Sequence, residues 1–367
     1  MYAARLLPQL VAAGADVTAF STDDAAGPDG VPVRPLAQLE VVEHIERPFD
    51  HLLYMLGNSE AHLAEEFHHR VRRHGSVLLH DARLVGLYRQ MAEWGPHLLP
   101  DPAGLVPTLH AMYPGRYEPW VPADGPPGAP LDGELVDRLG ILMARAAVDV
   151  ADRVLVHSAH AADLVEWDTG RRPDVAFPLP APRLDAFERR VEDDLVVSLG
   201  VVSPAKHSDR LVEAVAALPG VRLALVGPVD DAYRRTVEGL ADRLGVRDRV
   251  VLTGRVATEE YWAWLSRARV VVQLRAFSNG ESSGSAAEVL AAGVPLVVND
   301  IGTFRELPVD VVRHVTPGAD VAEVAAAVAA LLADDALSAS LSAAAVRHSE
   351  RIGYDAAARR LLDLLFG

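Results

Sequence analysis

Residues 270–299 read VVVQLRAFSNGESSGSAAEVLAAGVPLVVN, an order of apolar strand, polar loop, helix, glycine and second apolar strand. Apolar strands that alternate with helices are typical of parallel sheets, because each helix returns the chain to the start of the next strand. Such sheets bind ligands at the carboxyl ends of their strands. This stretch therefore predicts an α/β fold with a ligand at the polar loop.

The loop and the helix after it favour an anionic ligand. Gly280, Ser282 and Ser283 place small residues and free N–H groups at a helix N-terminus, where the helix dipole favours a diphosphate. Glu288 lies about one turn into the helix, and its carboxylate leans back toward that end and suits a ribose diol. The structural alternative is that Glu288 is a solvated helix position and that Gly293 only caps the helix.

The same alternation extends over the whole chain. Strands of the second half are predicted at 195–199, 222–226, 250–253, 270–274 and 295–299. In the first half, strands are predicted at 16–20, 51–55, 76–80 and 153–157, with helices at 2–13 and 60–73. The proline-rich stretch 178–194 is typical of a linker. We expect two doubly wound domains, at 1–180 and 181–345, and a C-terminal helix within 346–367 that packs back on the first domain.

The start of the first domain departs from the doubly wound pattern. Such a domain begins with a central strand and a glycine-rich turn, whereas this sequence opens on the predicted helix 2–13. The pattern therefore predicts a first domain that lacks its first strand, through a start assigned too late or a true loss. The irregular segment 96–131, with its prolines and aromatic residues, is expected near a binding cleft.

Composition excludes several classes of protein. The net charge of -16 disfavours binding to nucleic acid, which depends on Lys and Arg. The sequence has no cysteine, no apolar run of about 20 residues and no leader, so we expect a cytoplasmic protein without a transmembrane segment. No Asp-x-Asp occurs, which predicts metal independence. The cluster His62, Glu66, His68 and His69 is interpreted as a helix surface rather than a metal site.

The segment before Ala-x-Gly-x-Pro resembles the retaining glycosyltransferase family 4, whose members have the two-domain GT-B fold. In that family a Glu-x7-Glu segment holds the nucleotide-sugar, and its second Glu, which looks like Glu288, contacts the ribose. The position of the first Glu is Gly280 here, and the nearest acid is Glu281, one residue later. The resemblance implies the sugar contact for Glu281 if the loop is shifted.

A second stretch resembles the family's Gly-Arg-loop-Lys element, which binds the diphosphate. Gly200 follows the strand 195–199, and Lys206 stands where the family has its lysine. The family arginine is replaced by valine. Arg255 or Arg275 could supply the second cation, and the sequence does not choose between them.

Residues at the ends of first-domain strands complete the predicted site. His80 and Asp81 resemble the family's Thr-Leu-His-Asp region, where the histidine lies beside the transferred sugar; His110 is a second candidate for that histidine. The acceptor side is expected to include residues at the ends of two other strands: Gly57, Asn58, His157 and Ser158.

The resemblance implies transfer of a hexose from a nucleoside diphosphate sugar, with UDP or GDP as carrier, to an acceptor hydroxyl. It also implies retention of configuration and no cofactor, with His80, Asp81 and Glu281 as catalytic residues. A small molecule or a glycan is the expected acceptor. Two alternatives remain, a noncatalytic nucleotide-sugar-binding partner subunit and a nucleotide-sugar epimerase on the same fold.

Overall fold

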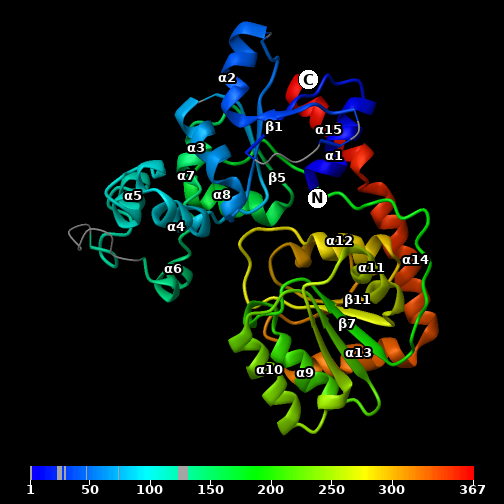
Figure 1. Ribbon diagram of the computed structural model, residues 1–367. Coiled ribbons are helices and arrows are strands. Elements are labelled where there is room, and N and C mark those ends of the chain that lie inside the picture. The colour runs from blue at the N-terminus through cyan, green and yellow to red at the C-terminus, as the bar shows by residue number, and fades with distance from the viewer. Residues whose placement is uncertain (1, 23–26, 29, 47, 73, 123–130) are drawn as a thin grey trace. The chain divides into compact units, whose positions relative to one another are not determined.

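The computed structural model describes residues 2–22, 27–28, 30–46, 48–72, 74–122 and 131–367 (Figure 1). The chain divides into two compact units, which we describe separately. The first unit comprises Met1–Pro178, Asn279–Ser282 and Ala358–Gly367. The second comprises Leu179–Ser278 and Ser283–Ala357.

The first unit is built on a parallel sheet. Its four strands, in spatial order, are β3 (Leu53–Leu56), β4 (Ser76–Leu79), β5 (Val154–Val156) and β6 (Val175–Ala176). Two further strands, β1 (Ala19–Ser21) and β2 (Val33–Pro35), form a separate parallel pair after the first helix. All residues of β4 are buried, as expected for a central strand with helices on both faces.

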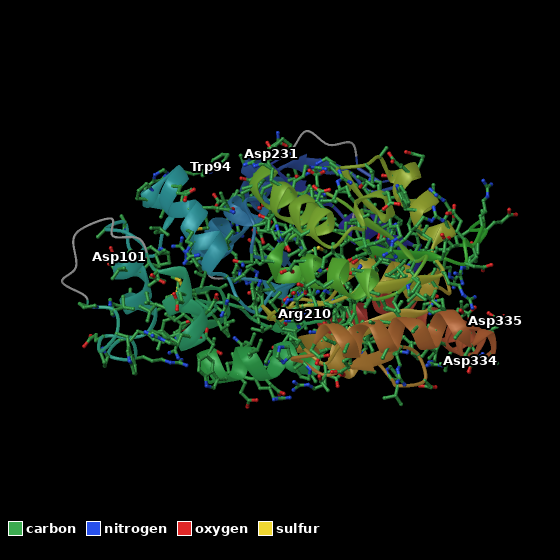
Figure 2. The ribbon with its side chains drawn as sticks, turned by 90° about the horizontal axis from the view of Figure 1, so that it is seen from below. Trp94, Asp101, Arg210, Asp231, Asp334 and Asp335 are labelled. Atoms are coloured by element: carbon green, nitrogen blue, oxygen red, sulfur yellow. The ribbon has the colours of Figure 1, made fainter. Side chains whose placement is uncertain are left out.

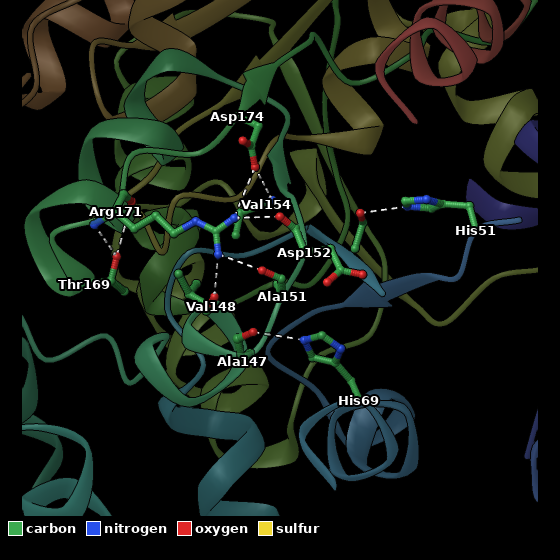
Figure 3. A network of polar contacts seen from close by, with 11 residues as sticks. His51, His69, Ala147, Val148, Ala151, Asp152, Val154, Thr169, Arg171 and Asp174 are labelled. Atoms are coloured by element: carbon green, nitrogen blue, oxygen red, sulfur yellow. Dashed lines mark hydrogen bonds and ion pairs between the residues drawn. The ribbon is translucent and has the colours of Figure 1, made fainter. Parts of the chain in front are cut away.

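Helices cover this sheet and extend from it. They are α1 (Tyr2–Ala12), α2 (Leu39–Val41), α3 (Leu63–Arg72), α4 (Val85–Trp94), α5 (Leu105–Met112), α6 (Gly133–Leu139), α7 (Arg145–Asp149) and α8 (Ala159–Thr169). The side chain of Arg171 holds the segment that leads into β5. It donates to the carbonyls of Val148, Ala151 and Asp152 at 3.1, 2.7 and 3.0 Å (Figure 3).

Within the segment 96–131, residues 123–130 lie outside the described residues, and the described part is less irregular than the sequence predicts, because it contains α5. Tyr113 and Tyr117 point into the core rather than toward a ligand, and the hydroxyl of Tyr113 donates to Asp168 at 2.5 Å. These aromatic residues therefore anchor the segment to α8. Trp120, in contrast, is exposed.

The second unit has a six-stranded parallel sheet. Its strands, in spatial order, are β12 (Arg313–Val315), β11 (Leu296–Asn299), β10 (Val270–Gln273), β7 (Leu195–Leu199), β8 (Arg222–Val226) and β9 (Val250–Gly254). Side chains of β7 alternate between two cores, with Val196 in one and Val197 in the other. Helices on both faces supply these cores, so the domain is doubly wound.

The helices of the second unit follow its strands in order. They are α9 (Ser208–Ala216), α10 (Asp231–Arg243), α11 (Thr258–Arg267), α12 (Gly284–Ala291), α13 (Val321–Ala333) and α14 (Asp335–Arg351). The chain ends with α15 (Tyr354–Phe366), whose residues from Ala358 onward are counted with the first unit. Figure 2 labels Asp334, the N-cap of α14, and Arg210, on α9. Asp334 accepts from the N–H of Leu337 at 2.9 Å, and Arg210 donates to the carbonyl of Ala319 at 2.5 Å.

In the described part of the chain, each single helix is too short or too polar to cross a membrane. Only α13 and α14 taken together, with a bend of 96° between them, meet the length and composition of a span.

Candidate active site

The strand order of the second unit reverses between β7 and β10. Successive strands proceed from β7 through β8 to β9 on one side, whereas β10, β11 and β12 lie on the other. The loops that leave β7 and β10 therefore separate, and ligands bind in the crevice between such loops. Here the loops remain linked by one hydrogen bond, from the N–H of Ala276 to the carbonyl of Ala205 at 2.9 Å.

Two cations stand at this crevice. Lys206 ends a short 3-10 turn after β7 (Pro204–Lys206), and it is the only lysine in the sequence. Burial, with a smaller contribution from the charge of Arg275, lowers the pKa of Lys206 to about 8. No ion pair to Lys206 is found among the residues that the structure describes. Two neighbouring positive charges favour an anion bound beside them.

Arg275 is held in place through its backbone. Asn299, at the end of β11, accepts from the N–H of Arg275 at 2.9 Å and donates its amide N–H to the carbonyl of the same residue at 2.7 Å. The guanidinium lies 4.8 Å from the ring centre of Phe304, and the residue is 5% exposed. The carboxamide of Asn299 thus fixes the direction in which the chain leaves β10.

The helix α12 presents its N-terminus beside this strand end. Ser283 is its N-cap, with the hydroxyl accepting from the N–H of Ala286 at 3.3 Å. Gly280 has a φ of 80°, in the left-handed region that favours glycine. The carboxylate of Glu281 turns onto its own loop and accepts from the N–H of Asn279 at 2.6 Å. Gly280, Glu281 and Ser282 belong to the first compact unit, whereas Ser283 begins the second-unit portion.

Glu288 is not the solvated helix residue of the structural alternative. Its side chain is buried, at 9% exposure, and Oε2 accepts from the hydroxyl of Tyr261 at 2.7 Å. A buried carboxylate needs such donors, because it has lost most of its hydration. Glu288 therefore offers a fixed hydrogen-bond acceptor rather than a surface charge.

In the first unit, two histidines meet at the carboxyl ends of β4 and β5. Nε2 of His157 lies 3.2 Å from Nδ1 of His80, and the rings stack at 5.2 Å with 19° between their planes. Tyr2 covers both rings edge-on, at 4.7 and 5.3 Å. Burial lowers the pKa of His80 to about 3 and that of His157 to about 4. Both rings are neutral at pH 7, so the pair can exchange hydrogen bonds with hydroxyls but carries no charge for a phosphate.

Asp81 and the end of β3 lie next to this pair. The carboxylate of Asp81 accepts from the N–H of Asn58 at 2.8 Å. A Cβ added at Gly57 would lie 3.0 Å from Nε2 of His62 and 3.1 Å from Oδ2 of Asp81, so glycine allows this close approach. The strand ends thus bring together His80, Asp81, Gly57 and Asn58.

Comparisons with known proteins agree with this arrangement. Residues 184–348 match the family model of glycosyl transferases group 1. A D-inositol 3-phosphate glycosyltransferase of Xylanimonas cellulosilytica is 33% identical over 278 residues, 71% of this chain and 65% of that protein. One from Streptomyces avermitilis is 31% identical over 71% of this chain and 59% of its own length.

The region 184–348 of this chain belongs to the group 1 glycosyltransferases. The matched region spans somewhat less than two thirds of the length of these two relatives. Sucrose-phosphate synthase from Thermosynechococcus elongatus superimposes with a TM-score of 0.65 at 20% identity, covering 97% of this chain and 90% of that one. HepE of Anabaena, in complex with UDP and glucose, superimposes with a TM-score of 0.64 at 15% identity, covering 98% of this chain and 94% of that one. These similarities confirm the predicted GT-B fold.

The strand order of the second unit distinguishes the two candidate arginines. Arg275 follows β10, the immediate neighbour of β7, and its charge acts on Lys206. Arg255 is exposed and follows β9, the edge strand, with β8 between β9 and β7. The structure therefore favours Arg275 as the second cation, in place of Arg255. Gly200, at the end of β7, has a φ of 103° and so takes a conformation that favours glycine.

One sequence interpretation needs correction. Glu66 and His69 are fully buried, so these two residues belong to the core rather than to a helix surface. Glu66 accepts from Tyr88 at 2.7 Å, and His69 contacts the carbonyl of Ala147 at 3.0 Å (Figure 3). The hydroxyl of Ser158 caps α8 by accepting from the N–H of Ala161 at 2.9 Å. His110 lies within α5.

Sequence reasoning missed several residues of the site. Asn299 and Gln273 are polar residues in apolar strands, a signal that could have identified them. Gln273 is fully buried and donates to the carbonyl of Leu199 at 2.9 Å and to Ser285 at 3.3 Å, which connects β7 to α12. Tyr261 offers no local signal, because its role depends on how α11 packs against α12.

Proposed function

We propose that this protein transfers a sugar from a nucleoside diphosphate sugar to an acceptor hydroxyl. The observation that carries the proposal is the pair Lys206 and Arg275 at the point where the sheet order reverses. Two cations there would bind the diphosphate and stabilise the negative charge that develops when it leaves. The N-terminus of α12 and the carboxylate of Glu288 would bind the rest of the nucleotide.

The finer chemistry is also proposed. We expect a hexose donor carried by UDP or GDP, retention of configuration by front-face substitution, and no metal. The cation pair supports metal independence, because it supplies the charge that a divalent ion gives to other sugar transferases. Product analysis by NMR tests the stereochemistry, since an inverted anomer would contradict retention. Activity that EDTA abolishes and Mg²⁺ restores would contradict metal independence.

In the first unit, the neutral ring of His80 suits a hydrogen bond to a sugar hydroxyl. Asp81 positions the loop after β3 through the N–H of Asn58. His157 is buried and partners His80, so we assign it a positioning role rather than contact with the acceptor. The sugar contact of Glu281 remains a proposal. Glu281→Ala tests it, because unchanged turnover and donor affinity would leave the segment with a nucleotide-binding role only.

The acceptor to test first is a small polyol phosphate. The two relatives reported above are named D-inositol 3-phosphate glycosyltransferases. Incubation of the protein with UDP-sugars or GDP-sugars and inositol phosphates, followed by mass spectrometry of the products, tests donor and acceptor together. Absence of binding to every nucleoside diphosphate would overturn the proposal.

One observation favours a second candidate function, that of a noncatalytic nucleotide-sugar-binding subunit. The carboxylate of Glu281 accepts a hydrogen bond from its own loop, whereas in family 4 the first Glu contacts the sugar. A noncatalytic nucleotide-sugar-binding subunit would show donor binding by calorimetry without turnover or donor hydrolysis. An epimerase would change the donor sugar without any acceptor, which NMR of the sugar nucleotide detects.

A further inference from the structure

A glutamine stands in β10 at a position where the pattern of the sheet places an apolar residue. Side chains alternate along the strand, and Val271, two positions before Gln273, packs in one core with Val289 and Leu290 of α12. Gln273 is fully buried, and its Oε1 has no hydrogen-bond partner among the residues that the structure describes. Burial of such an oxygen costs folding free energy. Stability of the core therefore does not explain this residue.

The amide of Gln273 joins the two chain segments that flank the reversal of strand order. Nε2 donates to the carbonyl of Leu199, the last residue of β7, at 2.9 Å and to the hydroxyl of Ser285, in the first turn of α12, at 3.3 Å. The hydroxyl of Ser285 lies 3.2 Å from that of Ser283, the N-cap of this helix. One side chain thus sets the distance between the end of β7 and the start of α12.

The turn after β7 is also held by the neighbouring strand β8. The N–H of Gly200 donates to the carbonyl of Val226 at 2.9 Å. A Cβ added at Gly227 would lie 2.1 Å from the carbonyl oxygen of Gly200, so glycine is required for this close approach. Because β8 fixes the turn independently, loss of the Gln273 bridge should displace the start of α12 rather than the turn.

Both segments suit a phosphate group. The first N–H groups of a helix have no acceptor within the helix, and the helix dipole favours an anion beside them. The turn after β7 leads to Lys206, the last residue of the following 3-10 turn. A diphosphate can contact both segments at once, whereas a monophosphate contacts one. Two linked contacts add their free energies only where the spacing of the two segments matches that of the two phosphates.

We propose that Gln273 is a positioning residue that makes the nucleotide site select a diphosphate over a monophosphate. The inference rests on the proposed function, because it assigns a specificity to the donor site of that function. The bridge from Leu199 to Ser285 holds the turn and the helix at the spacing of two linked phosphate groups. Its consequence is that a nucleoside diphosphate competes with the donor far better than the corresponding monophosphate does.

The test compares UDP with UMP by calorimetry; if GDP or ADP binds more tightly than UDP, that nucleotide and its monophosphate replace them. Gln273→Met keeps the length of the side chain and removes both donated hydrogen bonds. It should raise the Kd of the diphosphate about tenfold and that of the monophosphate less than about twofold, so the ratio of the monophosphate Kd to the diphosphate Kd falls. Ser285→Ala removes one of the two bonds and should lower this ratio about threefold.

The double variant shows whether Gln273 acts through α12. In a Ser285→Ala background, Gln273→Met should lower the ratio by only about a further threefold, because one of its two bonds is already absent. A fall of about tenfold in both backgrounds would overturn the inference, since Gln273 would then not act through Ser285.

Ser266→Ala is the matched control. Ser266 is also buried in the second unit, but its hydroxyl donates to the carbonyl of Ala263 at 2.8 Å, within α11. This variant should lower thermal stability and leave the ratio of Kd values unchanged. A Gln273→Met protein that behaves in the same way would show a purely structural role and overturn the inference. If Gln273→Met does not fold, an unchanged ratio in Ser285→Ala overturns it.

The outcomes separate the inference from the proposed function. A wild-type protein that binds UDP and UMP equally, or whose ratio Gln273→Met does not change, overturns only the role of Gln273. A wild-type protein that binds no nucleoside diphosphate overturns the proposed function and the inference with it. A ratio that falls in Gln273→Met, and falls less in the Ser285→Ala background, supports the inference.

Discussion

Each unit has polar residues at the carboxyl edge of its own parallel sheet, yet the two sets of residues differ in charge. The second unit brings Lys206 and Arg275 together as neighbouring cations. The first unit brings His80 and His157 together as neutral rings whose pKa values burial lowers to about 3 and about 4. The comparison teaches that one scaffold can hold both a charged and an uncharged polar site, which under the proposed function would bind a leaving diphosphate and sugar hydroxyls respectively.

Removal of either cation of the second unit should produce the largest effect, a loss of kcat/KM. Lys206→Ala and Arg275→Ala should each lower kcat/KM about 100-fold, because the leaving diphosphate loses a stabilising charge. Lys206→Ala should cost little thermal stability, because it removes a charge that burial and Arg275 both disfavour. Steady-state kinetics and thermal unfolding measure the two effects. A loss for Arg255→Ala as large as that for Arg275→Ala would contradict the choice of second cation.

The pH dependence of nucleotide binding should sharpen the comparison. Lys206 binds an anion in its charged form, and its pKa is about 8, so nucleoside diphosphate affinity should fall as pH rises through 8. By about pH 9 the affinity should be lower by about tenfold, because one unit above the pKa the neutral form of lysine outnumbers the charged form about ten to one. Calorimetry over the range of about pH 6.5 to 9.5 measures the nucleotide affinity as a function of pH.

Lys206→Arg is the control for that experiment. Arginine remains protonated over this range, so the variant should bind the nucleotide with an affinity that hardly changes between the two ends of the titration. An equal fall in affinity for Lys206→Arg and the wild type would assign the pH dependence to a different group.

Asn299 tests whether the second unit depends on the orientation of its cation. Asn299→Ala removes two hydrogen bonds to the backbone of Arg275 and should lower the free energy of unfolding by about 2 kcal/mol. It should also reduce kcat/KM about tenfold, since Arg275 loses its fixed direction. Ser338→Ala is the control, because the buried Ser338 donates to the carbonyl of Leu331 at 2.6 Å. This variant should lose stability without the loss in kcat/KM.

The smallest expected effect concerns acid stability in the first unit. Because the folded-state pKa values of His80 and His157 lie below the unfolded value near 6.5, the unfolded chain binds more protons between about pH 6.5 and 3. Stability is therefore present above pH 6.5 and decreases as the pH falls. His157→Gln should move the acid midpoint, followed by circular dichroism, downward by about half a pH unit. An equal shift for the exposed His97→Gln would contradict this origin.

Local sequence predicted the elements of the second unit well. Five of its six strands are predicted apolar runs, whereas β12 carries Arg313 and His314 and was not predicted. Asp230, Ser283 and Asp320 are the N-caps of α10, α12 and α13. Such residues satisfy backbone N–H groups that the helix leaves free, so their signal is local. The position of Glu288 within its helix could be predicted for the same reason.

Strand order and burial could not be predicted from local pattern. The sequence offered Arg255 and Arg275 as equals, because each follows a strand, and only the sheet order distinguishes them. Glu66 and His69 looked like surface residues because acids and histidines usually are exposed, but their helix turns them into the core. The burial of Tyr113 likewise depends on Asp168, 55 positions later in the chain.

Lys206 also gives the protein an unusual chemical handle. The sequence contains no other lysine and no cysteine, so the only other amine is the one at the N-terminus. Amine-reactive esters attack the unprotonated amine, and a lysine whose pKa is about 8 is half unprotonated at that pH. Acylation followed by mass spectrometry would therefore label the proposed diphosphate site at a single side chain. Protection of that side chain by a nucleotide would report the occupied fraction of the site directly, without a substrate analogue or an engineered probe.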